Sequence, residues 1–370
     1  MSQLNLVGKN LQNTRKALDI TQDEVASALG ISRSAISLIE SGQRNVNSIE
    51  LARFANLYHK TISEFLDPEP TPNGFEVLFR AERISKEDRV KIIEFEDLCK
   101  RYSDLEKRLY GRTDWNNIPI YKHPDSYLDM ERLATDERRR LDLGNAPIRD
   151  IFSLLESQGI RLFKLALESE LSGGFTYSEE IGSCILLNVN HGIRMVFTAA
   201  HEYCHCLIDR DVIATICREN YGRKKPQRES MANHFAGCFL MPREHVIECY
   251  DRCVGRRHRA IETDVILLSR YFGVSYDAML SRLKYLKLIT DSEYDELNKT
   301  QPTKIAEDNG LIPINLNSRK MPLKYINMAL KLYLREEISI GKLAEYLKVS
   351  IVETQKLVGF MTIEEVFEFV

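Results

Sequence analysis

The sequence of 370 residues lacks long hydrophobic runs, paired cysteine motifs and any large excess of charge. It contains no stretch of about 18 uninterrupted apolar residues, so we expect no membrane span. Its first residues lack the apolar core of a secretory signal peptide. These absences predict a cytoplasmic protein without a membrane partner.

Eight cysteines are scattered along the chain, and no C-x-x-C motif occurs among them. That spacing argues against a disulfide framework and against a zinc ribbon. The net charge of −3 provides no general attraction to nucleic acid, so any DNA-binding surface would have to be local. The length is sufficient for two or three domains.

The pattern of apolar residues predicts a mainly α fold with a small β-sheet, in the α+β class. Pro-rich and Gly-rich segments divide the chain into a five-helix domain, a linker with a connecting helix, an α+β domain and a mostly helical region. The expected boundaries are 1–67, 68–124, 125–290 and 291–370.

Residues 4–66 read as short helices. Thr21 begins one of them with Glu24 completing a capping box, and Ser32 begins the next after Gly30. Two short helices joined by a glycine-containing turn are typical of a helix-turn-helix. A further helix is expected to begin at Asn47 or Ser48.

Two strands are expected in the third region, GIRLFKLAL and SCILLNV, with a glycine turn SGG between them. The sequence leaves two interpretations open for the second strand. It is either a core strand or an edge strand that pairs with an extended peptide.

A helix predicted over 194–208 contains His201-Glu-Tyr-Cys-His205. Histidines four residues apart lie on one helical face and can bind one metal ion. Glu202 would then lie beside that ion as a general base acting on water. This arrangement is typical of a zinc peptidase.

A catalytic zinc needs a third protein ligand. The helix ESMANHFAGCFLM downstream places Glu229 and Asn233 on one face. Glu229 is the expected ligand, and Asn233 would hydrogen-bond a ligating histidine.

The segments RMVFTAAHEYCHCLI, ESMANHFAGCFLMP and SRYFGVSYDAMLSRL resemble the ImmA/IrrE metallopeptidases over roughly residues 130–290. The resemblance implies a zincin-like domain with a gluzincin-like site. One zinc ion would be held by His201, His205 and Glu229, with Glu202 as the base. Family members cleave transcriptional repressors.

The motif departs from the family pattern at Tyr203 and Cys204, and Met231 stands where members often have a second acid. If that second acid were the ligand, the assignment of Glu229 would fail. His191 and His234 are weaker ligand candidates. Tyr177 and Tyr203 are alternative donors to the transition state. Cys204 and Cys206 are either packed core residues or redox-active thiols near the metal.

Residues 7–66 resemble the helix-turn-helix domain of phage-repressor-like regulators. The helix after the turn would enter the major groove of double-stranded DNA. Arg33 can bind guanine, and phosphate contacts are expected from the flanks. The expected DNA-binding residues are Gln22, Arg33, Ser34, Ser37 and Arg44. Such domains often act as dimers, although the sequence identifies no interface.

These features predict a zinc endopeptidase with a DNA-binding domain, which cleaves a transcriptional repressor or antitoxin and so derepresses stress or mobile-element genes. The alternative is a helix-turn-helix regulator or antitoxin whose metallopeptidase-like domain is a non-catalytic sensor.

Overall fold

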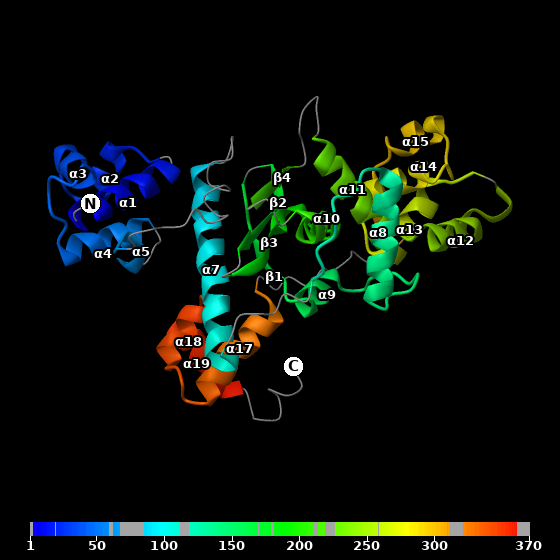
Figure 1. Ribbon diagram of the computed structural model, residues 1–370. Coiled ribbons are helices and arrows are strands. Elements are labelled where there is room, and N and C mark those ends of the chain that lie inside the picture. The colour runs from blue at the N-terminus through cyan, green and yellow to red at the C-terminus, as the bar shows by residue number, and fades with distance from the viewer. Residues whose placement is uncertain are drawn as a thin grey trace.

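A computed structural model gives the fold of the chain (Figure 1). Of the expected linker and connecting helix, 68–124, residues 68–84 and 112–117 lie outside the part that the structure describes. The described residues are 3–18, 20–58, 62–66, 85–111, 118–168, 170–178, 181–209, 214–218, 226–257, 259–308, 310 and 321–360.

The N-terminal domain consists of five short helices, as predicted. Thr21 accepts a hydrogen bond from the Glu24 amide and so caps α2, and Gly30 ends that helix at a φ of 68°. Asn47 is the residue that caps α4. The helices are α1 (Gln3–Ala17), α2 (Gln22–Leu29), α3 (Arg33–Glu40), α4 (Ser48–Leu57) and α5 (Ile62–Leu66).

Within the described residues, four strands form one sheet in the order β1-β3-β2-β4. β1 (Arg161–Leu165) runs parallel to β3 (Gly182–Asn188), whereas β2 (Leu171–Ser178) is antiparallel to both β3 and β4 (Ala214–Arg218). β3 therefore lies between two other strands, and the prediction that SCILLNV is an edge strand is wrong. Its alternative, a core strand, is confirmed because all seven residues are buried.

The predicted glycine turn SGG is also wrong, because these residues lie inside β2. Gly173 and Gly174 pair with Leu187 and Leu186. A Cβ atom at Gly173 would come within 2.8 Å of both the Leu186 carbonyl oxygen and Thr198 Cγ2. Glycine at this position lets β2 pass close to the helix that carries Thr198. Glycines are also common in turns, so the sequence pattern of this strand resembles that of a turn.

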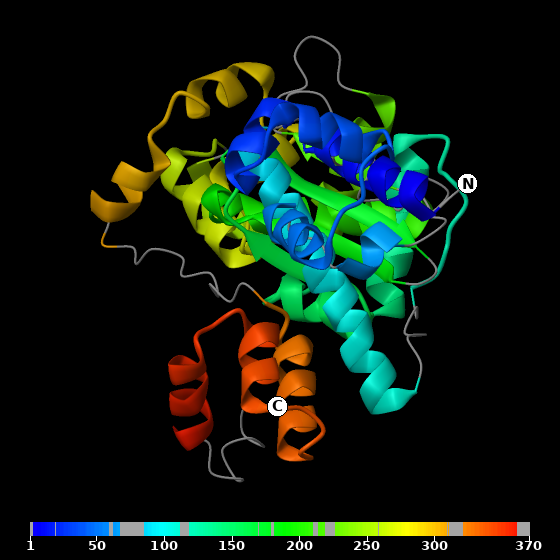
Figure 2. The same cartoon turned by 90° about the vertical axis from the view of Figure 1, so that its left-hand side faces the viewer.

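Helices cover both faces of the sheet (Figure 1). α10 (Arg194–Ile208) packs on one face, where Phe175, Ile185 and Leu187 belong to its hydrophobic cluster. On the other face Phe163 and Leu186 share a cluster with α7 (Lys86–Tyr110) and α17 (Leu323–Leu334). In both views α7 lies between the N-terminal domain and the sheet (Figures 1 and 2).

A buried ion pair joins these layers. Glu106 of α7 accepts a hydrogen bond from Arg161 of β1 at 2.6 Å and another from Lys324 of α17 at 3.2 Å. Both Glu106 and Arg161 are almost fully buried. Removing either side chain would leave the opposite charge buried without compensation, which is strongly destabilising. The C-terminal helices α17, α18 (Ile340–Leu347) and α19 (Ile351–Phe360) are thereby tied to the sheet through α7.

The remaining helices lie on the α10 side of the sheet, and α9 and α11 among them contact α10 (Figure 1). They are α8 (Tyr127–Arg140), α9 (Ile151–Ser157), α11 (Gln227–Leu240), α12 (Arg243–Val254), α13 (Glu262–Phe272), α14 (Tyr276–Tyr285), α15 (Asp291–Leu297) and α16 (Pro302–Asp308), with short 3₁₀ turns at Val189–His191 and Gly255–Arg257. No helix among the described residues is long and apolar enough to cross a membrane.

Candidate metal site and DNA-binding surface

α10 spans Arg194–Ile208, as the sequence predicts, and it is buried on nearly all sides. The spacing of four places His201 and His205 on one face, with 3.2 Å between their Nε2 atoms. Their side chains are 6% and 0% exposed. Two imidazole nitrogens thus face the same small, buried space.

α11 brings Glu229 to the same space. Its Oε2 lies 3.2 Å from His201 Nε2, and its Oε1 lies 3.5 Å from His205 Nε2. Ligands of one tetrahedral zinc ion, bound at about 2.0–2.2 Å, stand about 3.3–3.5 Å apart. The three donor atoms therefore match the separation that a single zinc ion requires.

The other ring nitrogen of each histidine is bound by a neighbouring side chain. His201 Nδ1 donates to Asn233 Oδ1 at 2.7 Å, and His205 Nδ1 donates to Asp209 Oδ2 at 2.5 Å. These hydrogen bonds place the proton on Nδ1 and leave the Nε2 lone pair directed at the shared space. Both histidines are thereby held in the form that binds metal.

Asp209 did not emerge from the sequence, although it lies four residues after His205 on the same helical face. The spacing alone could have indicated it. Burial alone would raise the pKa of the Asp209 carboxyl, but its contacts with His205 and Arg228 lower the pKa by a larger amount. The net pKa therefore lies below the usual value. Asp209 consequently remains a carboxylate, and Arg228 Nε lies 2.7 Å from it.

Glu202 follows the first histidine and is fully buried. β2 passes so close that a Cβ at Gly173 would be 3.1 Å from Glu202 Oε1. The sequence did not indicate Gly173 as part of the site. Its missing side chain leaves room for the carboxylate beneath the sheet.

Tyr203 points away from the donor atoms. Its hydroxyl donates to Glu137 Oε2 of α8 at 2.7 Å and accepts from Arg140 at 3.0 Å. The alternative that Tyr203 stabilises a transition state is therefore wrong. Tyr177 of β2 pairs with Ser183 in the sheet and packs against the α10 cluster.

Both motif cysteines are fully buried in the hydrophobic cluster around α10. Burial raises the pKa of the Cys204 thiol well above its usual value, so it is not a thiolate. Met231 is buried in the same cluster. This helical position faces the core, whereas Glu229 faces the histidines. His234 lies beside a different pair of side chains, Glu131 and Cys238.

The predicted DNA-binding residues divide into two groups. Arg33, Ser34 and Ser37 lie on the exposed face of α3. Gln22 instead donates to Glu40 at 2.8 Å, and Arg44 donates to Glu50 at 2.6 Å. The last two side chains therefore stabilise the domain in this conformation.

Comparison with known proteins gives two family matches. Residues 155–284 match the IrrE N-terminal-like domain, and residues 11–65 match a helix-turn-helix domain. The chain therefore contains an IrrE-like domain and a helix-turn-helix domain. Its architecture is that of a DNA-binding regulator with a metallopeptidase-like domain.

One curated relative of this chain is antitoxin PezA of Streptococcus pneumoniae serotype 4. It is 24% identical over 131 residues, which are 35% of this chain and 76% of the relative. The crystal structure of ComR from Streptococcus suis matches over 99% of this chain and 94% of its own at 12% identity. Its TM-score of 0.16 carries no argument about the fold.

Proposed function

We propose that this chain is a zinc-dependent endopeptidase that cleaves a transcriptional repressor or an antitoxin. The convergence of His201, His205 and Glu229 on one buried space, beside the buried Glu202, is the observation that supports it most. A binding-only sensor would not need a buried carboxylate at that position.

In this proposal His201, His205 and Glu229 hold the ion. Zinc, when bound, acts as a Lewis acid and lowers the pKa of water. Glu202 takes the proton from the attacking water and delivers it to the leaving amine. Asn233 and Asp209 hold the two imidazoles in their ligating orientation.

The target is inferred from the second domain. A helix-turn-helix domain on the same chain favours a substrate that is itself bound near DNA, in the cytoplasm, which a repressor or antitoxin would be. The exposed face of α3 supplies Arg33, Ser34 and Ser37 for base contacts. We expect the domain to bind double-stranded DNA, as a homodimer if its site is a palindrome.

Glu202→Gln tests the proposal. Zinc-loaded wild-type chain and the variant are each incubated with a cytosolic extract of the source organism, and new protein N-termini are labelled and sequenced. We expect cleavage sites that appear with the wild type only. Equal N-termini in both reactions would overturn the peptidase assignment.

The second candidate is a regulator or antitoxin whose IrrE-like domain senses a ligand and cleaves nothing. The similarity to antitoxin PezA favours it. Zinc binding and DNA binding without any Glu202-dependent cleavage would establish this alternative. Selection of binding sites from a random DNA pool, followed by a gel shift with Arg33→Ala, tests the DNA-binding domain separately.

A further inference from the structure

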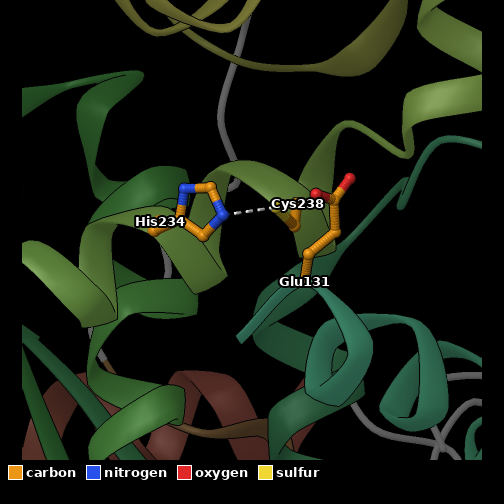
Figure 3. A group of neighbouring side chains, drawn as sticks. All are labelled: Glu131, His234 and Cys238. Carbon is orange, nitrogen blue, oxygen red and sulfur yellow. Dashed lines mark hydrogen bonds between the residues drawn. The ribbon is translucent and has the colours of Figure 1, made fainter. Parts of the chain in front are cut away.

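A second group of potential metal ligands lies on another side of α11. Glu131 of α8 and His234 and Cys238 of α11 each direct one donor atom into a common space, and these atoms all lie within 4.8 Å of one another (Figure 3). His234 and Cys238 are four residues apart, the spacing that also aligns His201 with His205.

The distance between imidazole and thiol matches one ion. His234 Nε2 lies 3.6 Å from Cys238 Sγ. With zinc–nitrogen and zinc–sulfur bonds of about 2.0–2.1 and about 2.3 Å, tetrahedral ligands of these types stand about 3.6 Å apart. In the absence of an ion the two side chains are within reach of a weak hydrogen bond to sulfur (Figure 3).

Two tyrosine rings pack against the imidazole of this group. The His234 ring lies edge-on between Tyr127 and Tyr285, with ring centroids 5.0 and 4.7 Å away. Burial lowers the pKa of His234, which keeps the imidazole neutral at neutral pH. Metal binding requires that neutral form.

Two arginines could oppose a cation here: Arg243, whose Nη1 lies 4.0 Å from Glu131 Oε1, and the more deeply buried Arg282. Its Nη1 donates to Cys238 Sγ at 3.3 Å, while Nη2 lies 3.9 Å from Glu131 Oε1. Burial raises the pKa of the Cys238 thiol to about 11, and the contact with Arg282 offsets this only in part, so the thiol would lose its proton when it binds the ion. With the thiolate and the Glu131 carboxylate, the group supplies two negative charges for one divalent ion.

We propose that Glu131, His234 and Cys238 form a second metal site, which binds a zinc-type divalent ion and fastens α11 to α8. The combination of imidazole, thiolate and carboxylate suits zinc. Glu131 and His234 are only half-buried, which leaves the fourth position to water. Because α11 also carries Glu229, an ion here would fix the helix that completes the first site.

Cobalt(II) tests this proposal on the full-length, metal-free chain. The first site offers only nitrogen and oxygen ligands, so thiolate-to-cobalt charge-transfer absorption reports the second site alone. We expect two equivalents of cobalt and this near-ultraviolet band. Glu229→Gln should weaken one equivalent and retain the band, whereas Cys238→Ser should abolish it.

The chain supplies a matched control in α12. His245 and Cys249 have the same spacing, with 3.8 Å between Nε2 and Sγ, but they belong to no three-donor group among the described residues. Cys249→Ser should therefore leave the band unchanged. Absence of the band in the wild type, or its loss in Cys249→Ser with retention in Cys238→Ser, would overturn the proposal.

Glu131→Gln provides a second test if Cys238→Ser fails to fold. Loss of the carboxylate ligand should weaken cobalt binding at the thiolate site more than tenfold while the far-ultraviolet circular dichroism stays unchanged. Unaltered affinity in a folded Glu131→Gln protein would remove Glu131 from the site and overturn the three-ligand assignment.

Discussion

The candidate metal site and the exposed face of α3 are built in opposite ways. The metal site is enclosed, and its donors come from α10 and α11 with further contacts from the end of α10. The α3 face is supplied by one helix of eight residues, and its Arg33, Ser34 and Ser37 side chains are exposed to solvent. Buried polar groups need partners, so changes in the first site affect structure and binding together. Changes on α3 should affect binding alone.

Loss of a ligand should have the largest effect. Glu229→Ala removes the carboxylate that lies beside both histidines. Loss of an outer hydrogen-bond partner can lower metal affinity by about 100-fold, and we expect loss of this ligand to lower zinc affinity by more. Competition with a chromophoric chelator, in a Cys238→Ser background, measures this site alone. Gln227→Ala, an exposed change in the same helix, is the control. Unchanged affinity in Glu229→Ala would show that Glu229 is not a zinc ligand.

Removing Asp209 should have the next largest effect. In Asp209→Ala the His205 ring loses its Nδ1 partner, and zinc affinity should fall about 10–100-fold. Arg228 would also lose its carboxylate, so the melting temperature of the metal-free chain should decrease. Asp251→Ala on the exposed side of α12 serves as the control. A variant with wild-type zinc affinity would show that the His205 orientation does not depend on Asp209.

The α3 face should respond without any loss of stability. Arg33 is 66% exposed and its closest carboxylate, on Asp23, is 3.6 Å away, an ion pair of little energetic value. Arg33→Ala should weaken DNA binding about tenfold, near the lower end of the range for a lost base contact, and leave the melting temperature unchanged. Gel shifts and calorimetry measure the two quantities. A large drop in melting temperature would break the contrast between the two surfaces.

Acid should produce the smallest effect, inside the N-terminal domain. Burial raises the pKa of Glu40, but hydrogen bonds from Arg15 and Gln22 outweigh it and leave the pKa below 4.5. A lowered carboxyl pKa contributes stability above the unfolded value, and that contribution is lost as pH falls through the folded value. Acid unfolding of this domain, followed by backbone amide protection, should be less steep in Glu40→Gln. Identical profiles would show that Glu40 does not contribute.

Local sequence patterns correctly predicted those structural features that are set by residues a few positions apart in the chain. The extent of α10, the capping of α2 by Thr21 and the shared face of His201 and His205 all follow from spacings of three or four residues. The same rules misread the SGG segment of β2, because a glycine required by a helix above the strand resembles a glycine required by a turn. The domain boundaries remain a prediction.

The connecting helix and the C-terminal region show a further limit. The sequence indicated amphipathic helices at both places but not what they cover. In the fold α7 and α17 pack on the face of the sheet opposite α10, with Glu106 joined to Arg161 and Lys324. Contacts between residues 55 and 218 positions apart leave no periodic signal in the chain.

The sequence alone determined which donors exist and which of them share a helical face, because helical geometry repeats every few residues. Only the tertiary structure decided which faces meet. The packing of α10 against α11 brings Glu229 to the two histidines, and the packing of α8 against α11 brings Glu131 to His234 and Cys238. Hydrophobic burial holds the helices at a short distance from one another. At that distance, side chains from different helices can bind the same ion.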